Sequence, residues 1–191
     1  VERVEVAVRT QMVYHFAHLY GAFGYLDHTN LPNMDNENFT QWIDDLYNET
    51  RRSKERFVEH FKNKYGDLHD RLPIWMLAEI MSFGRMLTMF NGIDSRLKRT
   101  IAQEYKIQDD ILQNWLGALN VIRNICAHHG RLWNRELAYK FYIPRINKAP
   151  EWHVPVKVGN NRIFTALTVL RYLLRYIAPS SGWQMRMYSL L

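Results

Sequence analysis

The chain has 191 residues, 47% of them hydrophobic and 14% aromatic, which suits a single domain with a sizeable core of large rings. Its one cysteine, Cys126, excludes an intrachain disulfide and favours a reducing, cytoplasmic location. No uninterrupted apolar run approaches the roughly 18 residues that a membrane span needs, which argues against a membrane protein.

The net charge is +6, but it is unevenly spread along the chain. Residues 1–95 hold 10 Lys and Arg against 14 Asp and Glu, whereas residues 96–191 hold 15 against 5. Lys and Arg gain free energy by displacing counterions from phosphates, so this imbalance indicates a polyanion-binding face. The alternative is a basic protein whose charge serves solubility alone.

Apolar residues recur at helical spacing almost throughout the chain. Pro73 suits the first turn of one helix, and an irregular stretch before the last helix has room for a small hairpin. The expected helices span residues 1–23, about 39–65, 72–90, 94–105, about 109–133 and 162–178. We therefore predict an all-α bundle of about five to seven helices, forming one domain over residues 1–191.

The expected helix over about 109–133 carries two distinct lines of side chains, because residues three and four apart share a face. One line is apolar and comprises Trp115, Leu119, Ile122, Cys126, His129 and Trp133. The other is polar and comprises Asn120, Asn124, His128, Arg131 and Arg135. Arg123 lies between the two. The pattern predicts a buried Cys126 and a core position for His129, and leaves His128 as the candidate for chemistry.

Arg123 and His128 are five positions apart, which turns a helix through roughly 500° and leaves them about 140° apart. One straight helix would not bring both side chains to the same phosphate. A two-fold pairing of such helices would gather two arginines and two histidines in one cleft. The spacing therefore favours a dimeric site.

An Arg–His pair without a carboxylate cluster or a cysteine nucleophile suits cleavage of RNA by its own 2′-OH. A histidine can take the hydroxyl proton or protonate the leaving 5′-oxygen, and an arginine can hold the phosphate. No metal or other cofactor is required. DNA lacks the 2′-OH and should not be a substrate.

At these residues the sequence resembles known proteins. The spacing Arg123-Asn124-x-x-x-His128 is similar to the R-x4–6-H motif of HEPN ribonucleases, and "RNICAHHGRLWNR" closely resembles the signature of the Abi family of bacterial abortive-infection proteins, AbiD/AbiF type. The blocks "RTQMVYHFAHLYGAFGYLD" and "LPIWMLAEIMSFGRM" also resemble that family, so the likeness covers about residues 4–135.

The resemblance implies a HEPN-like helical bundle that pairs to form a metal-independent endoribonuclease, acting in phage defence or as a toxin. It makes Arg123 and His128 the catalytic pair, with Asn124 as the accompanying polar residue and His129 as a second histidine of open role. It also implies RNA as substrate and a structured RNA as a possible partner. The alternative is a non-catalytic or silenced RNA-binding protein on the same fold. Because relatives carry a further N-terminal segment and the chain lacks an initiator Met, we expect one to precede it.

Several other residues are candidates for a role. Glu79 lies inside an apolar stretch and, if buried, needs a cationic partner, which suggests a supporting role beside the motif. His15, His18 and His28 offer a weaker, metal-dependent alternative. Arg162, Arg171 and Arg175 in the last helix could extend an RNA-contacting surface. The aromatic candidates for stacking on unpaired bases are Trp133, Tyr139, Phe141 and Tyr142, at least half of which we expect in the core.

Overall fold

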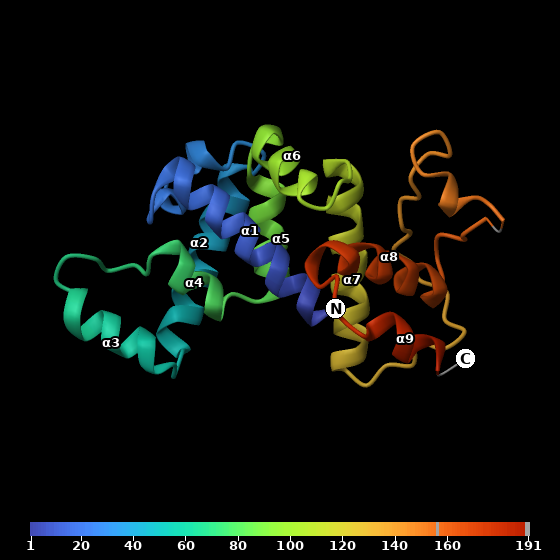
Figure 1. Ribbon diagram of the computed structural model, residues 1–191. Coiled ribbons are helices and arrows are strands. Elements are labelled where there is room, and N and C mark those ends of the chain that lie inside the picture. Colours follow the sequence, from blue (N-terminus) through green and yellow to red (C-terminus); the bar gives the residue numbers. More distant parts are fainter. Residues whose placement is uncertain (156, 190–191) are drawn as a thin grey trace. The chain divides into compact units, whose positions relative to one another are not determined.

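The computed structural model describes residues 1–155 and 157–189, and every regular element within them is helical (Figure 1). The α-helices are α1 (Glu2–Tyr20), α2 (Asn36–Arg52), α3 (Arg56–Tyr65), α4 (Ile74–Ile80), α5 (Phe83–Gly92), α6 (Ser95–Gln103), α7 (Asp109–Ala127), α8 (Ile163–Ile177) and α9 (Trp183–Tyr188). Short 3₁₀ turns lie at Gly24–Leu26, His28–Asn30 and Pro150–Trp152. The prediction of an all-α fold is confirmed. No helix in these residues is long and apolar enough to cross a membrane.

The backbone groups into two compact units. The N-terminal unit is Val8–Ile101, and the C-terminal unit combines Val1–Ala7 with Ala102–Leu191. The expectation of a single domain over residues 1–191 stays a prediction, as does dimerisation.

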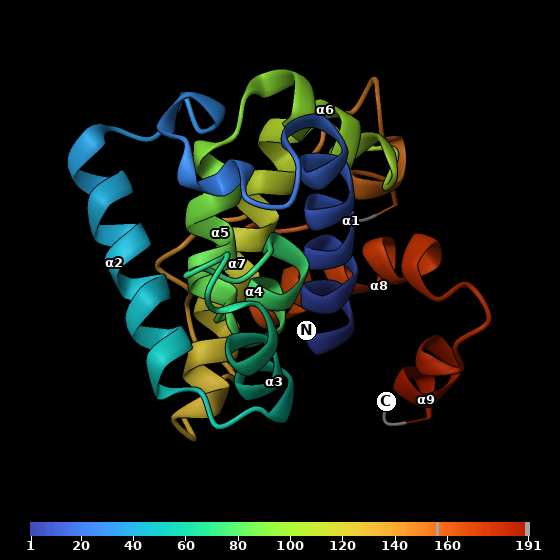
Figure 2. The ribbon, with the colours of Figure 1, turned by 90° about the vertical axis from the view of Figure 1, so that its left-hand side faces the viewer.

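The core of the N-terminal unit is built by α1, α2, α4 and α5 (Figure 2). Met12 and Phe16 lie one turn apart on α1 and are fully buried, because that spacing turns both toward the core. α2 contacts α4, and Trp42 on α2 donates from Nε1 to the Arg85 carbonyl in α5 at 3.1 Å. The Arg85 guanidinium lies 2.6 Å from the Asp45 carboxylate on α2. Both side chains therefore tie α5 to α2.

Two helices expected to be continuous are each divided at a serine. The helix expected over 39–65 is interrupted at Ser53, whose Oγ accepts from the Glu55 amide at 3.3 Å. The helix expected over 72–90 is interrupted at Ser82, whose Oγ accepts from the Arg85 amide at 3.3 Å and caps α5. Serine hydroxyls replace helical bonds at backbone amides, so a helix restarts after each one. The expectation of two unbroken helices is wrong.

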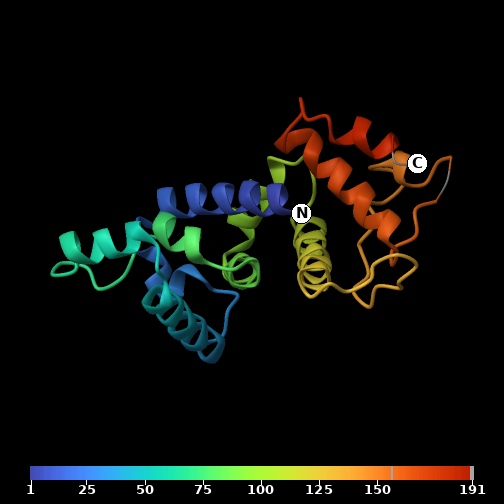
Figure 3. The ribbon, with the colours of Figure 1, turned by 90° about the horizontal axis from the view of Figure 1, so that it is seen from below.

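The core of the C-terminal unit is built around the first half of α7, which packs on α8 (Figure 3). Trp115 is fully buried and donates from Nε1 to the Tyr142 carbonyl at 2.8 Å. Asn114 donates to the Lys140 carbonyl at 3.1 Å and accepts from the Tyr142 amide at 2.6 Å. These bonds satisfy the backbone of the irregular segment after α7 and fix it against the helix.

Candidate functional site

The Arg–Asn–His motif lies at the C-terminal end of α7. Arg123 and Asn124 belong to its last turns, and His128 is the residue that caps it. All three side chains are exposed. Arg123 Nη1 donates to Asn124 Oδ1 at 3.3 Å, so the amide holds one edge of the guanidinium and the other edges face solvent. The motif is therefore open to a large ligand such as RNA.

α7 ends six residues earlier than expected, at Ala127 rather than Trp133. His129 adopts φ +54°, and its amide donates to the Cys126 carbonyl at 3.0 Å. The Gly130 amide donates to the Ile125 carbonyl at 2.7 Å. These two bonds form a Schellman motif, which places His129 at the left-handed position that usually holds glycine. Gly130, two residues past the cap, is the sequence signal that we missed.

The early end of α7 changes the expected surroundings of the motif. His129, expected on the core line, is exposed, and so is Cys126, expected to be a buried small hydrophobe. The buried line of α7 stops at Ile122. From Arg123 to His129 every residue is exposed except Ile125, which is partly buried. Arg123 and His128 keep their five-residue helical spacing and still diverge by about 140°. The end of α7 thus projects with open faces.

A short, well-held turn follows the motif. The Arg135 amide donates to the Leu132 carbonyl at 3.1 Å, and Asn134 within this turn has φ +55°. Arg162 donates to the Asn134 carbonyl at 3.2 Å and lies 3.9 Å from the Glu136 carboxylate. Arg162 therefore tethers the turn to the start of α8.

The turn carries exposed cations and an exposed indole. Arg131 and Arg135 are exposed, and Trp133 at the tip of the turn is 76% exposed. Tyr139 and Tyr142 are also exposed, whereas Phe141 is 1% exposed and belongs to the core. Of the four aromatic candidates for base stacking, the structure thus removes Phe141 alone. The expectation that at least half of them are core residues is wrong, because the segment leaves α7 early and turns outward.

Arg171 and Arg175 lie on α8 beside a cavity of about 200 Å³. Arg175 is exposed, and Arg171 is partly buried. Arg171 Nε is buried and has no hydrogen-bond acceptor among the described residues. Burial raises the pKa of the neighbouring Tyr172 hydroxyl, which therefore stays protonated and acts as a donor.

Glu79 does not occupy the buried position that its apolar surroundings suggested. It is exposed on α4, a helix of seven residues that ends at Ile80. Ser82, three residues further on, caps the next helix. A solvated carboxylate does not require a buried cation, so the reason for assigning Glu79 a supporting role is lost.

The histidines of the N-terminal unit make local contacts. His18 Nδ1 donates to the Tyr14 carbonyl at 2.7 Å, and His28 Nε2 donates to the Met34 carbonyl at 2.5 Å. His15 packs edge-on against the Tyr14 ring. Within residues 1–155 and 157–189, no three His, Cys, Asp or Glu side chains form a group that could hold a metal ion.

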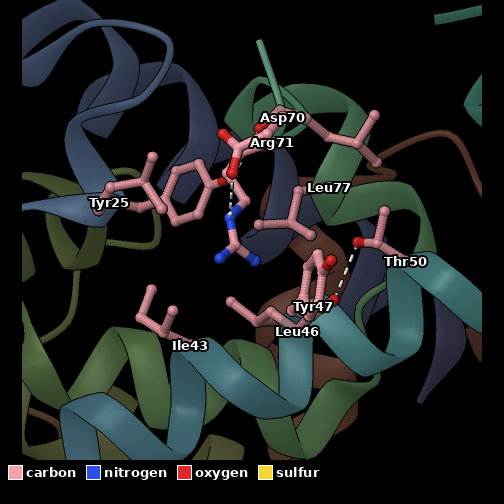
Figure 4. Close-up of a pocket in the computed structure, with 10 residues that line it drawn as sticks. Tyr25, Ile43, Leu46, Tyr47, Thr50, Asp70, Arg71 and Leu77 are labelled. Atoms are coloured by element: carbon pink, nitrogen blue, oxygen red, sulfur yellow. Dashed lines mark hydrogen bonds and ion pairs between the residues drawn. The ribbon is translucent and has the colours of Figure 1, made fainter. Parts of the chain in front are cut away.

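A hollow in the N-terminal unit is closed by one of its own side chains (Figure 4). Arg71 points between Tyr25 and Tyr47, with its guanidinium carbon 4.1 Å from the centroid of the Tyr47 ring. Its Nε lies 3.4 Å from the Asp70 carboxylate. The space left is about 10 Å³, which is about one water molecule. This hollow does not hold a nucleotide.

Fold and site together describe an all-α protein that presents an Arg-x4-His motif at the open end of a core helix. The family model described as "Abi-like protein" matches residues 1–134, and the chain belongs to that family. This membership confirms the resemblance to the Abi family and associates the chain with abortive infection, a bacterial defence against phage. No curated protein and no solved structure matches the chain significantly.

Proposed function

We propose that this protein is an RNA endonuclease of phage defence, in which Arg123 and His128 cleave RNA with the RNA 2′-OH as nucleophile. The observation that carries the proposal is the exposure of Arg123, Asn124 and His128 together at the end of α7, inside the segment that matches the Abi-like family. The packed part of α7 holds these three side chains at the surface, where a large ligand can reach all of them.

The proposed reaction conserves atoms and charge. A histidine takes the proton of the 2′-OH while the oxygen attacks the adjacent phosphorus. The bond from phosphorus to the 5′-oxygen breaks, and that oxygen leaves with a proton, which His128 of the second copy supplies fastest and water supplies more slowly in its place. Arg123 binds the non-bridging oxygens and stabilises the charge that develops on them. The products are a 2′,3′-cyclic phosphate and a 5′-hydroxyl.

Two copies of the chain supply the groups that this reaction needs. One α7 offers one His128, and its Arg123 points about 140° away. Pairing two α7 ends by a two-fold axis brings His128 of each copy toward Arg123 of the other. The open faces of the last turns leave room for this pairing.

The neighbouring residues have supporting roles in this proposal. Asn124 orients Arg123 through the 3.3 Å bond already described. Arg131 and Arg135 contact RNA phosphates next to the cut, and Trp133 stacks on an unpaired base. His129 either joins the reaction or holds the helix end, and its substitution separates the two.

The test uses purified protein and a single-stranded RNA in EDTA. We expect cleavage to a 2′,3′-cyclic phosphate, no cleavage of DNA of the same sequence, and a loss of rate of about 100-fold or more in Arg123→Ala and His128→Ala. His60→Ala, which removes an exposed histidine on α3, is the matched control and should cut normally. Cleavage that needs a divalent metal, or that survives both substitutions, would show the mechanism to be wrong.

Mixing the two inactive variants tests the dimeric site. A mixed dimer of Arg123→Ala and His128→Ala retains one Arg123 and one His128 on different chains. We expect the mixture to recover part of the activity that neither variant has alone. A site contained within one chain would give no recovery.

The basic excess after Arg123 also fits a second function. From this residue on, the chain has 11 Lys and Arg and only Glu136 and Glu151 as acids. A non-catalytic protein could use this charge to hold a structured RNA. In that case Arg123→Ala and His128→Ala would weaken RNA binding while the purified wild-type protein cuts nothing, so binding and cleavage are measured on the same samples.

A further inference from the structure

Three adjoining cavities form a continuous groove in the C-terminal unit, here called the α8 groove. Their volumes are about 200, 350 and 440 Å³. The first and second share Glu151 and Tyr172, and the second and third share Gln108, Ile111 and Lys148. The groove therefore runs from α8 to the first turn of α7. Most of its lining follows residue 134, outside the segment that matches the family.

The charge of the groove is predominantly positive. Its basic residues are Lys106, Arg145, Lys148, Arg171 and Arg175, and its acids are Asp110 and Glu151. Cations at several points along one path are what the phosphates of a nucleic-acid strand require, because each phosphate neutralised releases a counterion. A small anion would need one such point.

Arg171 offers a donor that its own chain leaves unused. Its Nε is buried, and no acceptor lies within reach among residues 1–155 and 157–189. A buried donor without an acceptor is unfavourable, because it has lost its bond to water and gained none in return. Because Arg171 lines the first cavity, a rotation of its side chain would bring this donor to a phosphate oxygen there, in a charge-assisted bond.

Aromatic side chains line the groove and support it. Tyr172 donates from its hydroxyl to the Lys106 carbonyl at 3.1 Å, which fixes the ring where the first two cavities meet. Below it Trp152 is buried, with its ring centroid 6.1 Å from Tyr172 and 5.2 Å from Trp115. Tyr142, 55% exposed, lines the third cavity. Rings held in this way stack on unpaired bases whatever their identity.

We propose that the α8 groove binds single-stranded RNA, with a phosphate at Arg171 and bases against Tyr172 and Tyr142. Adjoining cavities of this size each admit one base or sugar, whereas the broad cylinder of an A-form duplex cannot enter them. An acidic peptide would satisfy the cations but would leave the rings without stacking partners. The proposal deepens the endonuclease function and rests on it for the identity of the strand.

The groove lies away from the motif along α7. From Ile111, which lines the groove, to Arg123 is 12 residues, or about 18 Å of helix. The nucleotides bound in the groove therefore do not contact Arg123 or His128. Nucleotides further along the same strand extend from the groove to these two residues. The groove acts as an anchoring site that lowers KM and leaves kcat unchanged, because it touches no reacting atom.

Binding is measured by fluorescence anisotropy with a labelled, 2′-O-methylated single-stranded RNA that cannot be cut, at several salt concentrations. Arg171→Gln should weaken binding about 10-fold or more, since a bond to a charged group is lost. Arg171→Lys keeps the charge but lacks Nε and should remain weak. Lys148→Gln should weaken binding less and reduce the salt slope by about one. Lys140→Gln, an exposed lysine of the same unit that lines none of the three cavities, is the control and should bind normally.

Three outcomes would overturn the groove proposal. The first is that Arg171→Gln and Lys148→Gln bind the RNA as tightly as the wild type does, and the second is that the wild type binds duplex RNA as tightly as single-stranded RNA. The third is that an acidic peptide displaces the labelled RNA at a lower concentration than unlabelled RNA does. Thermal unfolding of each variant checks that the fold is intact. If the endonuclease proposal alone fails, no RNA is cut but the Arg171 variants still bind weakly. If the groove proposal alone fails, Arg171→Gln cuts with unchanged KM and cleavage still depends on Arg123.

Discussion

The first half of α7 and its last turn follow opposite rules. Trp115 and Leu119 are fully buried, and the side-chain amide of Asn114 both donates and accepts a hydrogen bond. Arg123, Asn124 and His128 are exposed on the same helix. Packing of buried side chains stabilises the first half of α7. The polar side chains of the last turn remain in water, where they need no partner within the protein. The candidate site therefore stands at the end of a packed helix, and we expect its side chains to contribute little to stability.

The largest expected effect comes from the buried half. Trp115→Ala should lower the free energy of unfolding by about 3–5 kcal/mol, because it removes a fully buried ring that contacts Trp152 and Tyr172. Arg123→Ala and His128→Ala should each change it by less than about 0.5 kcal/mol. Urea unfolding of the three variants measures the difference. A large loss of stability in either motif variant would contradict the division of α7.

Asn114 tests whether polar bonds in the buried half matter as much as apolar packing. Asn114→Ala leaves the Lys140 carbonyl and the Tyr142 amide without partners and should cost about 1–3 kcal/mol. Asn120→Ala on the same helix is the matched control and should cost less, because Asn120 is only partly buried. The comparison is made by urea unfolding with an unchanged m-value.

The sequence predicted the helical class and the buried line of α7 as far as Ile122, because helical periodicity extends over whole elements. It did not predict where helices stop. Ser53, Ser82 and Gly130 each end or restart a helix through one or two hydrogen bonds, and such local bonds leave no periodic trace. The false positions of His129 and Cys126 both follow from extending α7 past Gly130.

Exposure was the second quantity that the sequence could not supply. Glu79 has apolar neighbours in the sequence, yet its side chain is solvated, because a short helix buries only one face. The α8 groove also went unrecognised as a whole. Its residues come from the end of α6, the link to α7, α7 itself, α8 and the segment between α7 and α8, and only the tertiary fold brings them to one path.

The N-terminal end of α6 contrasts with the α7 end, because its polar side chain is hydrogen-bonded within the protein. Asp94 Oδ1 accepts from the amides of Arg96 and Leu97 at 2.7 and 2.9 Å, and its Oδ2 accepts from the Tyr20 hydroxyl at 3.0 Å. Burial alone would raise the pKa of Asp94, but these hydrogen bonds outweigh it and lower the pKa from its ordinary value of 3.8.

Asp94→Ala should therefore cost about 1 kcal/mol at pH 7, as expected for a lost helix cap. Asp94→Asn keeps a capping side chain and should cost less. A carboxyl whose pKa is lowered by folding stabilises the protein above its unfolded pKa, and this contribution is lost as pH falls through the folded value. Thermal unfolding between pH 7 and pH 2 should show the wild type and Asp94→Asn converging at the acidic end. A gap that stays constant would mean that the charge of Asp94 contributes nothing.

The smallest effect has the opposite sign and concerns His129. Its φ of +54° costs a non-glycine residue about 1–2 kcal/mol, and its side chain is exposed, so no packing offsets the cost. His129→Gly should raise the free energy of unfolding by up to about 1 kcal/mol, whereas His129→Ala keeps the Cβ and should gain nothing. RNA cleavage by the same two variants then decides why a histidine stands there. If His129 contributes to the site, the glycine variant is more stable and less active, because the strained position is kept for its side chain. If cleavage is unchanged, His129 only ends the helix, and glycine ends it better.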